Sequence, residues 1–276
     1  YREMLRCFDG VYWDNMFFSA NFDPVVGGAW TDEQGRVHPT MGLFHLRDLV
    51  KRTAVMLWQE SKQLPAHRKP PITLSHMTNT MTVPVHSFLN CTMDWEWKYG
   101  YDDFQDRFSP ESTVAETIGR QVGAWPTILA GGHPKPDDPR VDFLFRTRLG
   151  VALVHEIQVF DYRPPRDAEI YRRLFEFGYG ADGCRVFNYW QAGHPVEVEG
   201  IDARTLAMAS DAAAIVVVTD YGQGGPCRVT LDLDRLGLSQ EAKATDLETG
   251  EPIERVAPGR FAWEMKKHDF RILRVE

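Results

Sequence analysis

Short apolar segments typical of buried strands alternate with segments of helical periodicity along the first two thirds of the chain, and this alternation restricts the fold most. Apolar runs that end in polar residues predict strands at 9–15, 72–76, 91–97, 126–130 and 151–156. Apolar residues spaced three or four apart predict helices at 40–60, from 82, from 109, at 138–150 and at 167–177. Strands that alternate with helices pair in parallel, so this part is predicted to be an α/β domain.

The number of predicted strands suggests which α/β fold this is. A TIM-type (β/α)8 barrel closes with eight strands, and the alternation supplies five. We therefore predict that residues 1–183 form the C-terminal half of such a barrel, strands 4–8, and carry the catalytic site. The first three strands are expected in an upstream N-terminal segment of the same parent protein, as a covalent or non-covalent partner. An open doubly wound sheet is the alternative, but no strand is followed by a glycine-rich phosphate-binding loop.

The pattern changes near Cys184, where the helical period ends. Strand-like runs at 213–219, 227–233 and 270–275 are separated by turn-forming segments at 222–226 and 248–252. Residues 184–276 are therefore predicted to form an antiparallel, β-sandwich-like C-terminal domain.

Charge, hydropathy and cysteine spacing exclude several classes of function. The net charge is −8 and no basic stripe is present, which argues against a nucleic-acid partner. The longest apolar run, 212–218, is too short to span a bilayer. Four cysteines lie far apart without a CxxC pair, and the histidines lack metal-ligand spacing. No metal and no cofactor are expected, and the cysteines leave the cellular compartment unknown.

Polar residues follow several of the predicted strands. In a barrel, the carboxyl ends of the strands form the active site. The sequence there predicts a ring of carboxylates, imidazoles and amides: Asp14 and Asn15, His76 and Asn79, Asp94 and Glu96, His133, and His155 and Glu156. Glycoside hydrolysis requires one protonated carboxyl group for the leaving oxygen and one carboxylate for the nucleophile or the cationic transition state. The ring therefore favours a glycosidase.

The densest motif is Asp94-Trp95-Glu96-Trp97. On a strand, alternation places Asp94 and Glu96 on one face and the two tryptophans on the other. Two acids in one cleft raise each other's pKa, as general acid catalysis requires. The alternative interpretation is that these acids bind the amino end of a helix or an arginine.

Other acids and histidines allow both a functional and a structural interpretation. Asp14 follows apolar and aromatic residues, where a carboxylate is costly unless it is used or paired. His76 and His155 also follow apolar residues and are as well suited to the core as to a ligand. Glu116 and Arg120 have the spacing of an exposed helical ion pair.

Four blocks of sequence resemble glycoside hydrolase family 123 and its relatives. They are Asp9-Gly-Val-Tyr-Trp-Asp-Asn, Leu74-Ser-His-Met-Thr-Asn, the segment from Met93 to Phe108, and Gly183-Cys-Arg-Val-Phe-Asn-Tyr-Trp. Together with the ending Phe270-Arg-Ile-Leu-Arg-Val, the resemblance covers nearly the whole chain. It implies a TIM barrel with flanking β-domains and favours a secreted or periplasmic location.

The resemblance also implies an activity. Characterised family members are retaining β-N-acetylgalactosaminidases, in which the substrate's acetamido oxygen attacks the anomeric carbon. An Asp orients that group there and an adjacent Glu is the general acid/base. This chain departs from the pattern, because Asn15 follows Asp14.

The residues and the resemblance lead to one leading hypothesis, a glycosidase that cleaves a terminal sugar; the resemblance implies that it is a retaining N-acetylhexosaminidase. Asp14 is assigned as nucleophile or orienting carboxylate, and Glu96 or Asp94 as general acid/base. The expected substrate-binding residues are Trp13, Asn15, His76, Asn79, Trp95, Trp97, His155 and Glu156. The alternative is a non-catalytic carbohydrate-binding protein derived from a hydrolase. The separation of the carboxyl groups would distinguish the two.

Overall fold

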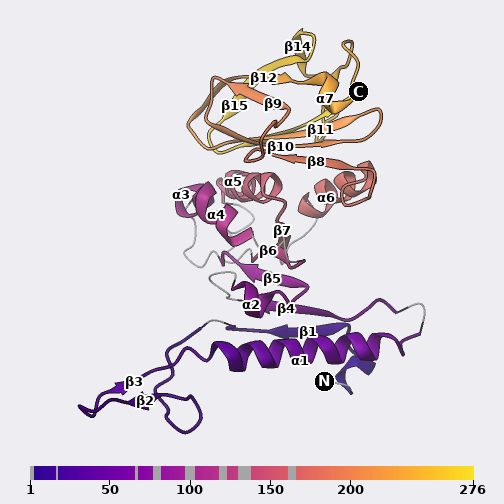
Figure 1. The fold of residues 1–276 in the computed structure, drawn as a ribbon. Coiled ribbons are helices and arrows are strands. Elements are labelled where there is room, and N and C mark those ends of the chain that lie inside the picture. Colours follow the sequence, from indigo (N-terminus) through magenta and orange to yellow (C-terminus); the bar gives the residue numbers. More distant parts are fainter. Residues whose placement is uncertain are drawn as a thin grey trace. The chain divides into compact units, whose positions relative to one another are not determined.

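The computed structural model describes residues 3–16, 18–65, 68–76, 82–96, 103–117, 123–129, 138–160 and 166–276 (Figure 1). The chain forms two compact units. Unit 1 consists of Tyr1–Glu96 and Glu111–Leu129, and unit 2 consists of Trp97–Pro110 and Ala130–Glu276. The predicted boundary between residues 183 and 184 falls inside unit 2 and stays a prediction.

Unit 1 contains a parallel sheet in which four strands lie side by side in chain order. They are β1 (Gly10–Trp13), β4 (Ile72–His76), β5 (Cys91–Asp94) and β6 (Trp125–Leu129). The register pairs Gly10 with Ile72, Leu74 with Cys91, and Cys91 with Trp125. These four predicted strands and their parallel pairing are confirmed. Because parallel strands point the same way, the residues after β1, β4 and β5 meet at one edge.

Three helices and a hairpin complete the described part of unit 1: α1 (Leu43–Ser61), α2 (Val83–His86), α4 (Pro110–Glu116), and β2 (Trp30–Thr31) with β3 (Val37–His38). Helix α1 runs alongside β1 (Figure 1). It buries Val50, Thr53 and Leu57, whose spacing places them on one face. Leu57 packs with Val11 of β1, and Val50 packs with Val85 of α2.

The first part of unit 2 contains the helices α3 (Phe104–Arg107), α5 (Val141–Val154) and α6 (Arg166–Phe177). Strand β7 (Gln158–Phe160) precedes α6. The sequence predicts these elements only in part. The predicted strand at 151–156 is wrong, because residues 151–154 are the last turn of α5. Every residue from Thr147 to Val154 is buried. A helix buried on all sides has the same continuous apolar run as a buried strand, so periodicity cannot separate them.

Two antiparallel sheets form the rest of unit 2. One has the order β13 (Ala244–Asp246), β16 (Phe270–Val275), β11 (Ala214–Asp220), β10 (Ala203–Ala209), β8 (Arg185–Asn188). The other has the order β14 (Glu254–Ala257), β15 (Arg260–Lys266), β12 (Gly224–Leu231), β9 (Val196–Glu199), and the short helix α7 (Leu233–Leu236) follows β12. Alternate residues of both sheets, such as Val216, Val229 and Phe261, share one apolar core.

Strand β11 is buried on both faces. Val216 and Val218 face the core between the sheets, whereas Thr219 faces α5 and donates a hydrogen bond from Oγ1 to the Gly150 carbonyl at 3.0 Å. A Cβ on Gly150 would lie 2.8 Å from the Thr219 side chain, so glycine allows α5 to approach the sheet. Burial on both faces explains why the longest apolar run of the sequence lies here.

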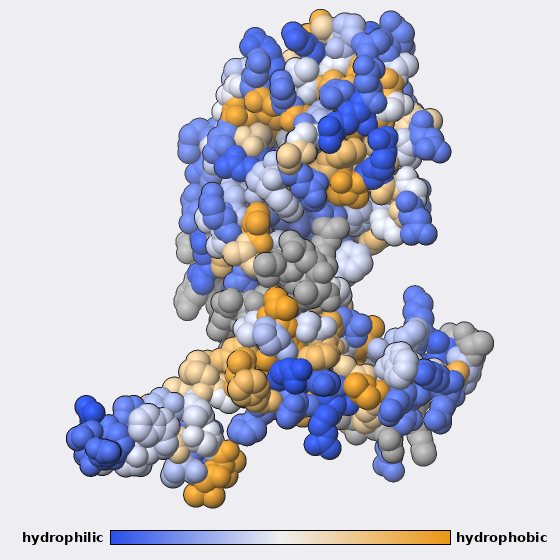
Figure 2. Space-filling view, in the orientation of Figure 1, coloured by the Kyte–Doolittle hydropathy of each residue, from blue (hydrophilic) through white to orange (hydrophobic). Residues whose placement is uncertain are grey.

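The two units differ in the apolar surface that they expose. Most of the large apolar side chains that are exposed belong to unit 1, including Val25, Val26, Phe44 and Trp58. Figure 2 shows apolar atoms gathered on the visible face of the part that contains α1 and β1. Among the described residues, no helix combines the length and the apolar character that crossing a membrane requires.

Candidate functional site

Three of the predicted site residues meet at the carboxyl edge of the parallel sheet. Asp14 follows β1, His76 ends β4, and Glu96 lies two residues after β5. Asp14 Oδ1 lies 2.9 Å from Nδ1 of His76, and Nε2 of the same imidazole lies 3.8 Å from Glu96 Oε2. The structure therefore places the imidazole between the two carboxyl groups, and we call this group the Asp14–His76–Glu96 cluster.

Asp14 is held by its neighbours and remains reachable from solvent. It accepts hydrogen bonds from the backbone N–H of Asn15 at 2.9 Å and from Asn15 Nδ2 at 3.2 Å. The Tyr12 hydroxyl lies 3.4 Å from Asp14 Oδ1 and 2.9 Å from His76 Nδ1. Asn15 has a φ of 55°, a left-handed conformation that asparagine tolerates better than most residues. The Asp14 side chain is 56% exposed, so a substrate can contact a carboxylate whose direction is already fixed.

The position of His76 gives it a defined electrostatic role. Its Nε2 is buried and has no hydrogen-bond partner within the described chain, and Glu96 is the nearest carboxylate that an ion pair could use. If Nδ1 carries a proton toward Asp14, Nε2 of a neutral ring is a proton acceptor beside Glu96. A protonated ring instead bridges two carboxylates. In either state the His76 ring lies between Asp14 and Glu96, so a change in the charge of one carboxyl group affects the other.

The imidazole also limits the separation of the two carboxyl groups. The two contacts and the width of the ring set an upper limit of about 9 Å between the oxygens concerned. Retaining glycosidases separate their carboxyl groups by about 5–5.5 Å and inverting ones by about 6.5–9.5 Å. This upper limit on the Asp14–Glu96 separation is compatible with glycosidase chemistry. It is compatible with a retaining and with an inverting mechanism.

The Asp94-Trp95-Glu96 motif is arranged differently from its prediction. Strand β5 ends at Asp94, and Trp95 has a φ of 54° and a buried side chain. The predicted continuation of the strand is therefore wrong for Trp95 and Glu96, because a left-handed residue ends the alternation that would place Asp94 and Glu96 on one face. Glu96 contacts His76, whereas Asp94 has a different acidic neighbour.

That neighbour is Glu116, at the end of α4. Burial, the charge of Asp94 and a hydrogen bond to Asp94 together raise the pKa of Glu116 to about 8. Glu116 is therefore the member of this pair that keeps a proton at neutral pH. Arg120 lies outside the described residues, so the predicted pair of Glu116 with Arg120 stays a prediction. Thr113 and Thr117, which flank Glu116, are buried.

His155 and Glu156 belong to unit 2 and lie just after α5, not at the end of a strand. Both are buried. His155 is 2.9 Å from the Tyr189 hydroxyl through Nε2 and 2.8 Å from the Val151 carbonyl through Nδ1. Burial lowers the pKa of His155 to about 4, so the ring is neutral. Glu156 accepts hydrogen bonds from Asn188 at 2.7 Å and from Tyr179 at 3.2 Å. These contacts give both residues a structural role, and their predicted contact with substrate stays a prediction.

The predicted aromatic residues are only partly placed. Trp13 is half-buried and packs against the apolar clusters of α1, and Trp95 is buried. Asn79, Trp97 and His133 lie outside the described residues. Stacking of a sugar on these rings therefore stays a prediction.

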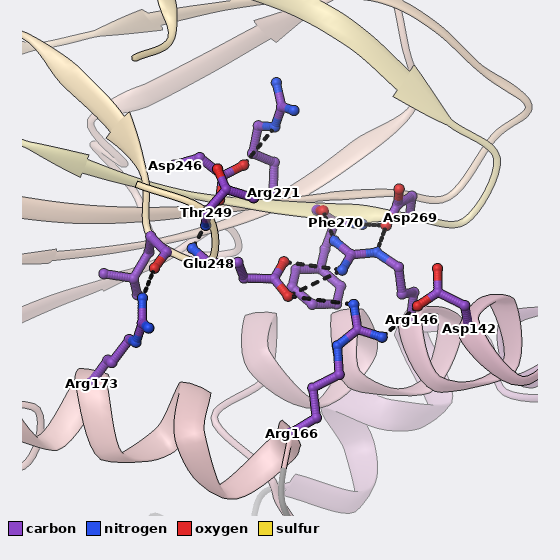
Figure 3. Close-up of polar contacts among 11 residues, drawn as sticks. Asp142, Arg146, Arg166, Arg173, Asp246, Glu248, Thr249, Asp269, Phe270 and Arg271 are labelled. Atoms are coloured by element: carbon purple, nitrogen blue, oxygen red, sulfur yellow. Dashed lines mark hydrogen bonds and ion pairs between the residues drawn. The ribbon is translucent and has the colours of Figure 1, made fainter. Parts of the chain in front are cut away.

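Two cavities of unit 2 are lined by other residues. One, of about 620 Å³, lies between α5, α6 and the turn after β13 and is crossed by ion pairs (Figure 3). Arg146 bonds Glu248 at 3.0 Å and stacks over the Phe270 ring at 4.0 Å, and Arg271 bonds Asp246 at 3.1 Å. The other, of about 660 Å³, lies between β7 and α6. Neither is lined by a predicted site residue, and the charged groups shown in Figure 3 satisfy one another.

No family model and no curated protein matches the chain. Among solved structures, α-galactosidase I from Mortierella vinacea is 10% identical with a TM-score of 0.50, over 83% of this chain and 62% of that one. A GH27 β-L-arabinopyranosidase from Geobacillus stearothermophilus is 12% identical with a TM-score of 0.48, over 81% and 54%. AmyP, solved in complex with maltose, is 10% identical with a TM-score of 0.49, over 99% and 77%.

These similarities concern the fold. The chain has a fold similar to that of glycoside hydrolases and spans just under two thirds of the α-galactosidase that it matches. The resemblance to family 123 stays a prediction, because no family model matches.

Proposed function

We propose that this chain is the catalytic part of a glycoside hydrolase that removes a terminal sugar from a glycan or glycoconjugate. The observation that supports the proposal most directly is the Asp14–His76–Glu96 cluster. Two carboxyl groups joined by an imidazole lie where parallel strands end, which is where α/β barrels carry their active sites. Similarity in fold to an α-galactosidase supports the same class of reaction.

The contacts of Asp14 and Glu96 suggest a different catalytic role for each of the two acids. Asp14 is fixed by Asn15 and open to solvent, which suits a carboxylate that attacks the anomeric carbon or orients the group that does so. Glu96 is more enclosed and lies beside the unpartnered Nε2 of His76, which suits the general acid/base. His76 is a positioning residue in this assignment, because it acts on the sugar through the two acids.

Asp94 is the second candidate for the general acid/base, and Glu116 strengthens its case. A carboxyl pair that holds one proton at neutral pH is a proton source, as the protonation of a leaving-group oxygen requires. In this alternative the proton reaches the leaving oxygen from the Asp94–Glu116 pair. In a retaining mechanism the same pair then accepts a proton from the attacking water, and Glu96 takes no part in proton transfer.

The finer features of the proposal come from the sequence. The substrate is an N-acetylhexosaminide and the mechanism retaining, as the resemblance to family 123 implies. Trp13, Asn15, Asn79, Trp95, Trp97, His155 and Glu156 are the proposed substrate-binding residues. The parallel sheet is proposed to be half of a TIM-type barrel that an upstream segment of the parent protein completes, followed by a β-sandwich-like domain.

Replacement of Glu96 by glutamine tests the proposal. On the aryl glycoside that the wild-type protein cleaves fastest, in a panel that includes N-acetylated sugars, Glu96→Gln should lower kcat by about 10²–10⁴-fold. The control is Glu33→Gln, an exposed acid in the β2–β3 turn, which should leave kcat unchanged.

The panel also separates the proposal from its rival, a non-catalytic carbohydrate-binding protein. Sugar binding without turnover of any glycoside, measured by titration calorimetry, supports the rival. Near-normal turnover by Glu96→Gln together with loss of turnover in Asp94→Asn transfers the general acid/base role to Asp94.

A further inference from the structure

A second group of metal-ligating side chains lies in unit 2, away from the residues of the proposed function. Asp103 and Asp106 belong to α3 and the residue before it, and His268 lies in the turn between β15 and β16. One ligand atom of each residue lies within 4.8 Å of the other two. The sequence did not predict this group, because 162 residues separate Asp106 from His268 along the chain.

The surrounding contacts fix Asp103 and the turn that carries His268. Asp103 caps α3 by accepting a hydrogen bond from the Gln105 backbone at 3.1 Å, and it also contacts Thr147 and His268. Asp106 stands three residues later, which places it on the same side of the helix. The backbone N–H of His268 donates to Asp220 at 3.0 Å. A prearranged set of donors loses little conformational entropy when it binds an ion.

A second observation is the buried side-chain oxygen of Gln105, whose amide group contacts the His268 carbonyl. Gln105 is 7% exposed, and its side-chain oxygen is buried without a hydrogen-bond donor among the described residues. Its Nε2 donates to the His268 carbonyl at 3.4 Å, which sets the orientation of the amide. A buried acceptor without a donor costs about 1–3 kcal/mol. A cation bound beside His268 would satisfy this oxygen.

We propose that Asp103, Asp106 and His268 bind one first-row divalent cation, with the Gln105 oxygen as a further donor. Two carboxylates and one imidazole form the ligand set typical of Zn²⁺ and Mn²⁺, whereas Ca²⁺ prefers oxygen ligands alone. The ion takes the place of the proton between His268 and Asp103. The other ring nitrogen of the neutral imidazole then carries that proton, because the nitrogen that binds a metal is unprotonated. The bound ion ties α3 to the β15–β16 turn and so stabilises unit 2.

Calorimetric titration of the metal-free full chain with Zn²⁺ tests the site. We expect one ion per chain and an increase in the melting temperature. Asp106→Asn and His268→Asn should each weaken binding by at least about 10-fold. Asp106 is exposed, so its replacement leaves the core intact. His268 has a φ of 50°, and asparagine tolerates that conformation.

Two control variants separate this site from ordinary surface binding. Asp211→Asn and His45→Asn remove an exposed acid and an exposed histidine outside the cluster and should leave the affinity unchanged. Absence of one-to-one binding by the wild-type chain would overturn the proposal. Equal affinity for Zn²⁺ in the wild-type chain and in both cluster variants would also overturn it, because the ion would then bind elsewhere. A buried water would in that case be the partner of the Gln105 side-chain oxygen.

Discussion

The two units differ in where they put their apolar and polar residues. In unit 2, two antiparallel sheets and α5 enclose a continuous core, and residues such as Val216, Val229 and Phe261 have no exposed surface. In the described part of unit 1, the apolar clusters around α1 contain four and three buried residues, and large apolar side chains such as Phe44 and Trp58 are exposed. Unit 1 nevertheless carries the Asp14–His76–Glu96 cluster. The difference indicates that the region that holds the proposed chemistry is not the region that supplies most of the stability.

The sheets explain this division. Two antiparallel sheets can bury their inner faces against each other and need no other element to complete a core. A parallel sheet has both faces covered in a finished domain, and its strand ends are left for function. Asn15 and Trp95, which follow β1 and β5, both have left-handed backbone conformations. Such conformations cost free energy and are common at functional sites.

The largest expected effect is the loss of activity in Asp14→Asn. The asparagine retains the size of the side chain but removes the negative charge, so we expect kcat/KM to fall by about 10⁴-fold, equivalent to about 5 kcal/mol. Because Asp14 is mostly exposed, the free energy of unfolding should change little. Turnover of an aryl glycoside and urea denaturation measure the two quantities. If Asp14→Asn lowered the free energy of unfolding together with the activity, the separation of chemistry in unit 1 from stability in unit 2 would be contradicted.

The converse change is Phe261→Ala in unit 2. Phe261 is fully buried between the two sheets, so its truncation should lower the free energy of unfolding by about 4 kcal/mol. The activity of each folded molecule should be unchanged. Urea denaturation followed by tryptophan fluorescence gives the first quantity, and activity normalised to the folded fraction gives the second. A large fall in normalised activity would show that the chemistry depends on the core of unit 2.

The sequence was sufficient for the parallel strands of unit 1 and for the pairing class of the C-terminal strands. Strands β1, β4 and β5 each combine an apolar run with polar residues directly after it, although the same pattern at 151–156 belongs to the end of α5. Asp14, His76 and Glu96 could be placed together from that pattern, because the ends of parallel strands meet. The distances between them could not, because they depend on side-chain directions.

The incorrect predictions have local causes. The run 151–154 is apolar because the second half of α5, Thr147–Val154, is buried on all sides, and composition alone does not separate this case from a strand. Strand β5 stops at Asp94 because Trp95 has a left-handed backbone conformation, which the identity of a tryptophan does not predict. Tertiary contacts decided each of these cases.

A smaller effect is expected for the pH dependence of stability caused by Glu116. Its pKa is raised from 4.5 in the unfolded chain to about 8, so the folded state binds the proton more tightly. Stability from this group is complete below about pH 4.5 and is lost as the pH rises to about 8. Because the side chain is partly exposed, we expect a loss of about 2 kcal/mol. Glutamine keeps the hydrogen-bond donor without ionising, so Glu116→Gln should lack this loss.

Denaturation of the wild-type protein and of Glu116→Gln at pH 5 and pH 9 provides the measurement. The difference between the two proteins, not the absolute stability of either, isolates this carboxyl group from the other titrating residues. Equal loss of stability in both proteins between the two pH values would show that Asp94 and Glu116 do not share a proton. It would also remove the support that this pair gives to Asp94 as a proton source.

The smallest effect is expected for Trp58→Ser on the exposed face of α1. Trp58 is 62% exposed and Phe44 is 74% exposed, and spacing places both on one side of the helix, whereas Val50 and Leu57 are buried on another. In this chain the substitution should change the free energy of unfolding by no more than about 0.5 kcal/mol, because little apolar surface is buried there. If an upstream segment completes the barrel, as proposed, the same substitution in the longer parent protein should cost about 1.5–3 kcal/mol. Urea denaturation of both proteins gives this difference directly. If the substitution changed the free energy of unfolding equally in both proteins, this face of α1 would also be exposed in the parent protein. Unit 1 would then expose more apolar surface than unit 2 in the parent protein as well.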